Sequence, residues 1–248
     1  MTASAVSLAL LATACGSEDK KDDAKTDTKP SVSAPAAPAA KGKTDAELAK
    51  LIVAQGDVAD TTFKEATPAE AAAGAAATSD KPECKVLVQA QSFGTLGTPS
   101  GTARTKAAGA SVKTPGAGAS EEDKLKAGLE ALTGASATAV TLTSYDGKGA
   151  EEAFASVKTA GTACAGGYSA TQAGETGKVT GVAPAAAITA GDEAVAYTVA
   201  ADADGEAFAT QLVVVRKGNT LATFSTLSLS GKAEQPKALV EAQAKKLG

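Results

Sequence analysis

The chain has 248 residues, a net charge of −4 and an apolar fraction of 44%, more than half of which is alanine. So few large apolar side chains are enough for one modest hydrophobic core, not two. The sequence contains no histidine, which excludes Ser-His-Asp and Cys-His catalysis and histidine-ligated metal sites. Lysines are interspersed with acidic residues along the chain, and this balance argues against a nucleic-acid partner.

The N-terminus carries a run of small and apolar residues at positions 3–14 without any charge. The run is shorter than the roughly 20 residues that span a bilayer, and it has the length of the apolar region of a signal peptide. No lysine or arginine precedes it, so we expect the natural start to lie upstream of Met1. The sequence therefore predicts a lipoprotein or secretory signal peptide over residues 1–14, with a truncated basic region.

Leu11-Ala12-Thr13-Ala14-Cys15 resembles the lipobox of bacterial lipoproteins, in which small residues precede an invariant cysteine. The resemblance implies a thioether-linked diacylglycerol on Cys15, cleavage before it, and a membrane anchor through acyl chains such as palmitate. The sequence departs from the family at Ala12, where Leu, Val or Ile is usual. This departure leaves open an ordinary secretory signal that is cleaved after Ala14, and both alternatives export the protein.

Residues 15–43 have the composition of a tether. They contain one large apolar side chain, Val32, nearly balanced charges, and three prolines within residues 30–38. Such a segment cannot bury enough apolar surface to offset the entropy of ordering it. We therefore expect a disordered spacer that holds a single domain, residues 44–248, clear of the membrane on its extracytoplasmic face, about 30 Å away on average.

The first half of this domain combines helix signals with an irregular segment. Residues 44–47 and 67–70 each place threonine three positions before glutamate, which is the capping-box pattern at the start of a helix. Residues 82–88 fit either a helix beginning at Pro82 or a valine-rich strand, and we favour the helix. Residues 92–119 are rich in Gly, Thr, Ser and Ala, and they predict a flexible segment, either a mobile flap or weak edge strands.

The middle of the chain reads as helix, strand and helix. Leu125, Leu129 and Leu132 recur at helical spacing after an acidic start at residues 121–123. Residues 139–145 have the pattern of a strand, and residues 149–162 have the pattern of a second helix.

The C-terminal third carries the clearest pattern of the chain. Residues 193–201 alternate, with Val195, Tyr197 and Val199 on one face, and residues 207–216 and 220–230 follow after turn sequences. A final helix is expected after Pro236. These elements predict an α+β fold: an antiparallel sheet, made of this three-stranded meander and at least one further strand, with helices packed on one face.

The three cysteines fit an exported protein. If Cys15 takes the lipid, Cys84 and Cys164 remain, and an exported chain rarely keeps two free thiols. We therefore predict a Cys84–Cys164 disulfide. A redox or metal pair is the alternative, but the chain has no histidine and no C-x-x-C spacing to support it.

Motifs that would carry chemistry are weak in this sequence. Residues 202–206 have the acidic residues of a calcium loop without its later ligands, and a hairpin turn explains them better. The glutamate pairs at 121–122 and 151–152 suit helix N-termini, where negative charge is favoured. We therefore predict no catalytic, cofactor-binding or metal site. Tyr168 and Tyr197 are candidates to line a pocket and Phe63 to close one, although core positions are commoner for such residues.

The whole layout, from lipobox to disulfide-bearing domain, resembles the cell-envelope lipoproteins of high-GC, Streptomyces-like actinobacteria. The folded part is loosely similar to the extracellular sensor-type domain of some mycobacterial serine/threonine kinases. The shared features are the spaced Cys84 and Cys164, the strand-rich C-terminal third and the closing helix at Pro236. This resemblance implies ligand or partner sensing at the cell surface.

Three functions remain open from the sequence. The first is a non-catalytic sensor lipoprotein with a small molecule or cell-wall fragment in a cleft between sheet and helices. The second is an interaction lipoprotein that docks an envelope protein. The third is an envelope enzyme, which is the least expected because the chain lacks histidine and recognisable catalytic motifs.

Overall fold

The structure of this chain is a computed structural model that describes residues 40–109, 120–122, 124, 136–203, 205–228 and 233–248. Its helices are α1 (Asp45–Leu51), α2 (Pro68–Ala76), the short 3₁₀ helix η1 (Pro82–Cys84), α3 (Lys85–Gln91), α5 (Gly149–Ala163) and α6 (Lys237–Leu247). Its strands are β1 (Thr61–Glu65), β2 (Thr78–Ser79), β3 (Gly101–Gly109), β4 (Ser136–Ser144), β5 (Tyr168–Gln172), β6 (Glu175–Pro184), β7 (Glu193–Ala203), β8 (Glu206–Lys217) and β9 (Thr220–Ser228).

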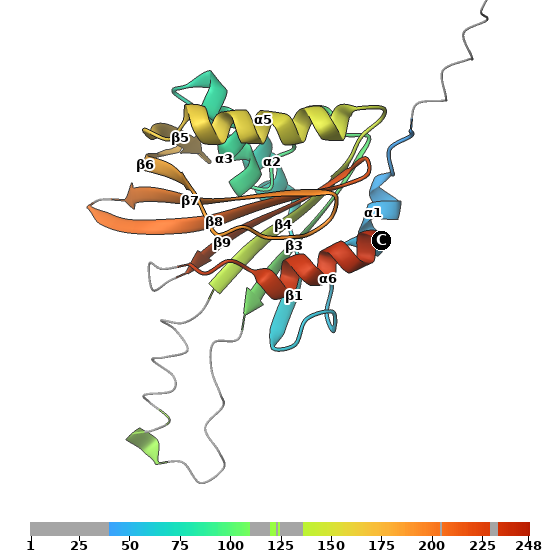
Figure 1. Ribbon diagram of the computed structural model, residues 1–248. Helices are drawn as coiled ribbons and strands as arrows, with labels where there is room; N and C mark the ends of the chain where they lie inside the picture. Colours follow the sequence, from blue (N-terminus) through green and yellow to red (C-terminus); the bar gives the residue numbers. More distant parts are fainter. Residues whose placement is uncertain (1–39, 110–119, 123, 125–135, 204, 229–232) are drawn as a thin grey trace, which may run out of the picture. The chain divides into compact units, whose positions relative to one another are not determined.

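Within the described residues, nine strands form one antiparallel sheet in the order β1-β3-β4-β9-β8-β7-β6-β5-β2 (Figure 1). The predicted meander is confirmed, because β7, β8 and β9 pair with one another in sequence order. Strands β4, β3 and β1 extend the sheet beyond β9, and β6, β5 and β2 extend it beyond β7. The α+β class is therefore confirmed.

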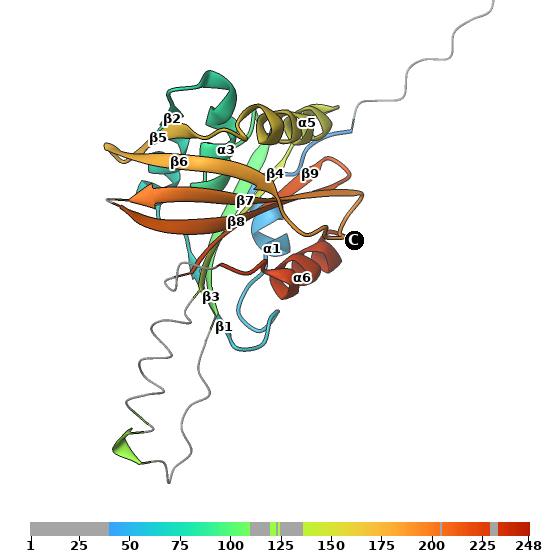
Figure 2. The same ribbon diagram turned by 60° about the vertical axis from the view of Figure 1, so that its left-hand side comes forward.

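The helices cover both faces of this sheet. Figures 1 and 2 show α3 and α5 on one face and α1 and α6 on the other. The sequence led us to expect helices on one face only, so this detail of the prediction is wrong. The reason lies in β8, where Leu212 and Val214 pack under α5 while Val213 and Val215 pack on the opposite face. Such a continuous apolar run is typical of a strand that is buried on both sides.

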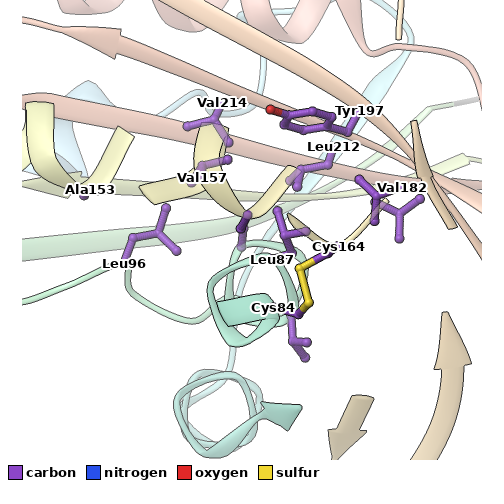
Figure 3. Close-up of a cluster of buried hydrophobic side chains, with 14 of the residues drawn as sticks. Cys84, Leu87, Leu96, Ala153, Val157, Cys164, Val182, Tyr197, Leu212 and Val214 are labelled. Carbon is purple, nitrogen blue, oxygen red and sulfur yellow. A yellow bond between two sulfur atoms is a disulfide. The ribbon is translucent and has the colours of Figure 1, made fainter. Parts of the chain in front are cut away.

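The cluster between α3, α5 and the sheet is called the disulfide core here. Its buried members include Cys84, Leu87, Phe154, Val157, Cys164, Tyr197, Leu212 and Leu221. Figure 3 shows the disulfide inside this cluster, with Leu87 and Val157 nearby. A Cβ atom at Gly161 would overlap the ring of Tyr197, so glycine is what allows α5 to lie this close to β7.

The cluster on the opposite face is called the terminal-helix core. Its buried members include Leu48, Val53, Val140, Val213, Phe224 and Val240. The fully buried Gln243 of α6 joins this core to the end of α1. Its Oε1 accepts the Val53 N–H and its Nε2 donates to the Leu51 carbonyl, both at 2.9 Å. One side chain thus satisfies a carbonyl that the end of this short helix leaves unpaired and the N–H of a residue just beyond it.

The predicted helix starts are confirmed in atomic detail. Thr44 accepts the Glu47 N–H while the Glu47 carboxylate accepts the Thr44 N–H, and Thr67 and Glu70 repeat the same reciprocal pair. The favoured helix at 82–88 is confirmed by η1 and α3, and the predicted strand at 139–145 and helix at 149–162 are confirmed by β4 and α5.

The prediction of a flexible segment at residues 92–119 is wrong for Gly101–Gly109, where the alternative of a strand holds, although this strand is not at an edge of the sheet. These residues form β3, which pairs with β1 on one side and β4 on the other, while residues 110–119 lie outside the described residues. The small and polar side chains of β3 alternate without large apolar residues, so they gave no strand signal. Strands β1, β2, β5 and β6 were also missed. β1, β2 and β5 are short, and β6 is exposed at most of its positions.

The ends of the predicted segments also differ from the structure. Residues 41–43, which the composition assigns to the tether, bond to the domain through Asp146, Ser144 and Asn219. Glu121, Glu122 and Lys124 are helical, whereas Leu125, Leu129 and Leu132 lie outside the described residues, as do Cys15 and the rest of 1–39. Where the structure describes the chain, no helix has both the length and the apolar composition to cross a bilayer.

Candidate ligand-binding groove

One part of the sheet face that carries α3 and α5 is left uncovered and forms a groove of about 720 Å³. It crosses β1, β3, β4 and β9 and reaches Thr210 of β8, and the end of α3 forms one wall. Its volume lies within the range of ordinary small-molecule sites. The groove is therefore the candidate functional site.

The floor of the groove consists of small side chains from strands that are far apart in sequence. They are Ala108 of β3, Ala137 and Ala139 of β4, Thr210 of β8 and Ser225 of β9. On the covered half of the same face, larger side chains such as Leu212 and Leu221 fill the space under α5. The sheet backbone continues beneath the groove, so the groove is hollow because its floor carries small side chains.

Leu227 gives the groove an apolar end. This side chain is 39% exposed, and it is the one large apolar side chain in the described residues that is classed as exposed. It lies on β9 directly opposite Ala137 of β4, with Thr210 of β8 on its other side. A ligand that lies over these positions would bury apolar surface that now faces water.

Phe93 forms part of the wall at the end of α3, with a backbone φ of 59°. The Gly94 N–H bonds to the Gln89 carbonyl at 2.9 Å, which is the closing bond of a Schellman motif, and Phe93 holds the position that glycine usually occupies. A bulky residue in this conformation costs about 1–2 kcal/mol. The Nε of Arg104 donates to the Phe93 carbonyl at 2.7 Å and helps to hold it.

Helix α2 supports this wall from behind. Gly74 of α2 is buried against the end of α3, and a Cβ atom at this position would overlap the backbone oxygen of Ser92. The Ser92 hydroxyl lies 2.7 Å from the Val88 carbonyl and 2.9 Å from Oε1 of Gln172 on β5. Hydrogen bonds and close packing therefore fix the wall in place.

The rim of the groove at the edge of the sheet is cationic. Lys64 of β1 and Lys106 of β3 are directly paired, and both line the groove. Their neighbours Phe63 and Ala107 pack in the terminal-helix core, so the two lysines belong to the opposite face. Among the described residues that line the groove, none is acidic.

Glu70 of α2 neutralises one of these lysines from outside the groove. The Lys106 Nζ lies 2.7 and 2.9 Å from its two carboxylate oxygens. The hydrogen bond from Lys106, followed by those from Thr67, lowers the pKa of Glu70 to about 2. In the described part of the chain, the Nζ of Lys64 has no ion-pair or hydrogen-bond partner, so one positive charge at the rim is left without a counter-charge.

A larger hollow of about 1100 Å³ runs between α1, α2 and the edge of the sheet. Its lining carries both signs of charge, with Asp45, Glu65 and Arg104. Asp45 uses a carboxylate oxygen to accept the Thr102 N–H at 2.6 Å, which joins α1 to β3. Because charged side chains of both signs stand beside its apolar residues, this hollow is a weaker candidate than the groove.

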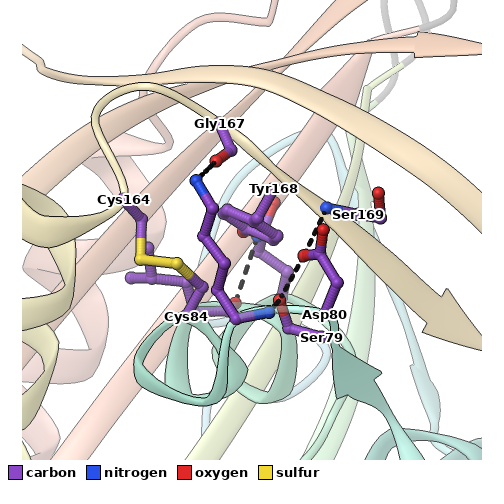
Figure 4. Close-up of a disulfide and its surroundings, with 10 residues drawn as sticks. Ser79, Asp80, Cys84, Cys164, Gly167, Tyr168 and Ser169 are labelled. Carbon is purple, nitrogen blue, oxygen red and sulfur yellow. Dashed lines mark hydrogen bonds between the residues drawn. A yellow bond between two sulfur atoms is a disulfide. The ribbon is translucent and has the colours of Figure 1, made fainter.

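The predicted disulfide is present between Cys84 and Cys164, with their Cα atoms 5.8 Å apart. It joins the start of α3 to the end of α5, and Figure 4 shows the adjoining segment held against β5. The Asp80 carboxylate accepts the Ser169 N–H at 2.8 Å, which lowers the pKa of Asp80. Because the other end of α3 is the groove wall, the disulfide contributes to the position of that wall.

The other residues that the sequence singled out fall into three places. Tyr168 and Tyr197 are buried in the disulfide core, and burial raises the pKa of each, to about 12 for Tyr168. Phe63 lies at the edge of the groove, with its side chain packed against the terminal-helix core. Residues 202–206 include the β7–β8 hairpin turn, where Asp202 Oδ1 accepts the Gly205 N–H at 2.9 Å.

The sequence did not reveal Lys64, Phe93, Lys106, Ala139 or Leu227 as a group. They come from β1, the end of α3, β3, β4 and β9, and only the non-sequential strand order brings them together.

The fold is similar to that in the crystal structure of the extracellular domain of PknH from Mycobacterium tuberculosis. The TM-score is 0.50 at 11% sequence identity, and the match covers 84% of this chain and 97% of that chain. At this identity the similarity shows a shared fold and says nothing of shared chemistry. It supports the resemblance that the cysteine spacing and the C-terminal elements indicated. No protein-family model matches the chain, and comparison with curated proteins finds no related sequence.

Proposed function

We propose that this chain is an extracytoplasmic, membrane-anchored lipoprotein of an actinobacterial cell envelope, whose folded domain binds a small ligand in the groove without catalysis. The observation that carries this proposal is the groove itself. An otherwise helix-covered sheet face is left open over small side chains, beside a wall fixed by Gly74, Phe93 and Arg104. Such a preformed concave site fits a carrier or sensor-type domain.

The anchor rests on the sequence around Cys15. A diacylglyceryl group on this cysteine would hold the protein stably, because two acyl chains bind a membrane far more firmly than one. The Cys84–Cys164 disulfide is consistent with an oxidising compartment outside the cytoplasm. The segment between Cys15 and the first described residues would then act as the spacer.

The side chains of the groove favour binding over catalysis. The described lining residues include two lysines and no carboxylate or cysteine, and the chain has no histidine. General acid–base catalysis usually needs one of the missing groups. Docking of an envelope protein is the alternative, and it is less well supported because Leu227 stands alone as a large exposed apolar side chain in the described residues.

Mass spectrometry of protein extracted from the membranes of its own cells tests both parts of this proposal. The denatured, non-reduced mass should include a diacylglyceryl group on Cys15, whereas Cys15→Ser should lack this group and leave the membrane fraction. The native mass should include a small molecule that leaves on denaturation. The variant Ala139→Leu places a larger side chain on the floor of the groove. It should lose this molecule while keeping the lipid.

The two parts of the proposal fail separately. A wild-type protein without acyl mass would contradict the lipid anchor and leave ligand binding to be judged from the native mass. A bound molecule that persists in Ala139→Leu would place the binding site elsewhere. A native mass of the lipidated chain alone, in extracts made without detergent exchange, would count against a resident ligand.

A further inference from the structure

We propose that the ligand of the groove is an amphiphile with one apolar chain and one anionic head group, either a carboxylate or a phosphate, and that Lys64 binds the head group. This inference rests on the proposed function and names the ligand class of the same site. The proposed ligand class follows from two gradients along the groove: lysines stand at the β1 end, and small or apolar side chains stand toward β9.

The strand register defines two parallel rows of side chains across the groove. One row runs Lys64, Lys106, Ala139 and Ser225 from β1 to β9. The other row runs Thr62, Ala108, Ala137, Leu227 and Thr210 from β1 to β8. With strands about 4.8 Å apart, β1 lies roughly 14 Å from β9. A ligand along these rows meets cations at one end and small or apolar side chains at the other.

The cationic end of the groove places like charges next to each other, which β-sheets usually avoid. Lys64 and Lys106 occupy directly opposed positions, and like charges placed in this way destabilise a pair of strands. Glu70 offsets only one of the two charges, and no acidic side chain lines the groove among the described residues. In a chain whose net charge is −4, this local excess of positive charge fits an anionic group.

The apolar end selects the rest of the ligand. Ala137, Ala139 and Leu227 offer contact without fixed hydrogen-bond partners, which suits an alkyl chain better than a sugar or a peptide backbone. Phe93, in the groove wall at the end of α3, holds a left-handed backbone conformation. Residues in such strained conformations cluster at ligand sites, because the surrounding structure must maintain them for a purpose.

Four probes with the same ten-carbon chain separate these contributions: decanoate, decyl phosphate, 1-decanol and decyltrimethylammonium. Binding to the purified mature protein is measured by titration calorimetry, below the critical micelle concentration of each ionic probe and below the solubility limit of 1-decanol. We expect one or both of the anions to bind most tightly, decanol more weakly, and the cation most weakly. Preference between decanoate and decyl phosphate distinguishes a carboxylate ligand from a phosphate ligand.

Three variants test the role of charge at the rim. Lys64→Met keeps the length of the side chain and removes its charge, and it should weaken binding of the anions about fivefold while leaving decanol unchanged. Glu70→Gln retains a residue that can complete the capping box and frees Lys106, and it should strengthen anion binding about threefold. Lys178→Met, an exposed lysine on β6 outside the groove lining, is the matched control and should change nothing.

Each contrary result has a distinct meaning. If decanol binds as tightly as the anions and Lys64→Met has no effect, the groove binds apolar ligands and the anionic class is wrong. If decanoate binds equally to Ala139→Leu, which still melts cooperatively, the site is wrong. If no probe binds, the amphiphile class is wrong, while a molecule co-extracted with the wild type and absent from Ala139→Leu would still support the proposed function.

Discussion

The disulfide allows the stabilisation of the fold to be worked out and tested. Cys84 and Cys164 are separated by 80 residues in sequence, and both are completely buried in the disulfide core. Closing a loop of this length is worth about 4.5 kcal/mol in the chain-entropy model at 25 °C. That value is a large share of the 5–15 kcal/mol by which domains are typically stable.

The perturbation is the double variant Cys84→Ala with Cys164→Ala, which removes the cross-link and leaves no free thiol in the core. We expect the free energy of unfolding to fall by about 4 kcal/mol. The melting temperature should fall by roughly 10 °C or more, given 2–4 °C per kcal/mol for a domain of this size.

Equilibrium unfolding in guanidinium chloride, followed by circular dichroism, measures the change. Wild-type protein unfolded under reducing conditions is the control, because it should match the double variant while keeping both sulfur atoms. A difference below about 1 kcal/mol between oxidised and reduced wild type would refute loop closure as a main source of stability. A large loss in the variant without one in reduced wild type would assign the effect to side-chain packing.

Three further substitutions test contacts that hold the domain together. Gln243→Met should lower the free energy of unfolding by about 2 kcal/mol, because it leaves the buried Val53 N–H unpaired, whereas Gln235→Met at an exposed bond should cost under about 0.5 kcal/mol in the same assay. Burial raises the pKa of Tyr145 from 10.0 to about 12, so the tyrosine ionises first in the unfolded state. The free energy of unfolding should therefore fall as the pH rises from about 10 to 12, and Tyr145→Phe should make this fall smaller when melting is measured over that pH range. The Gln55 amide bonds the outer edge of β1, so Gln55→Ala should raise concentration-dependent self-association in sedimentation velocity, and Gln235→Ala should not.

Local signals in the sequence predicted a good part of this fold. The β7–β9 meander was found because its strands are long and alternate, and α1 and α2 were found because their capping boxes are formed by adjacent residues. The Cys84–Cys164 pair followed from cysteine count and an expected export. In each case the determining interaction lies within a few residues or follows from chemistry that does not depend on distance.

Elements whose stability comes from their neighbours were missed. β3 contains no large apolar side chain, and it is a strand because β1 and β4 pair with both of its edges. The second covered face was missed although residues 212–215 form a continuous apolar run, which is typical of a strand that is buried on both faces. The groove depends on the same long-range order, since Lys64 and Ala139 are separated by β3 in the sheet and lie far apart in sequence.

The central claim is that the open part of the sheet face binds a ligand, and amide NMR spectra of the isotope-labelled chain during a decanoate titration test it most directly. Saturable shifts are predicted at Phe93, Ala108, Ala139 and Leu227, with none at Val53 in the terminal-helix core. Shifts centred on α1 and α6, or spread evenly over the whole sheet, would contradict the assignment of the groove as the binding site.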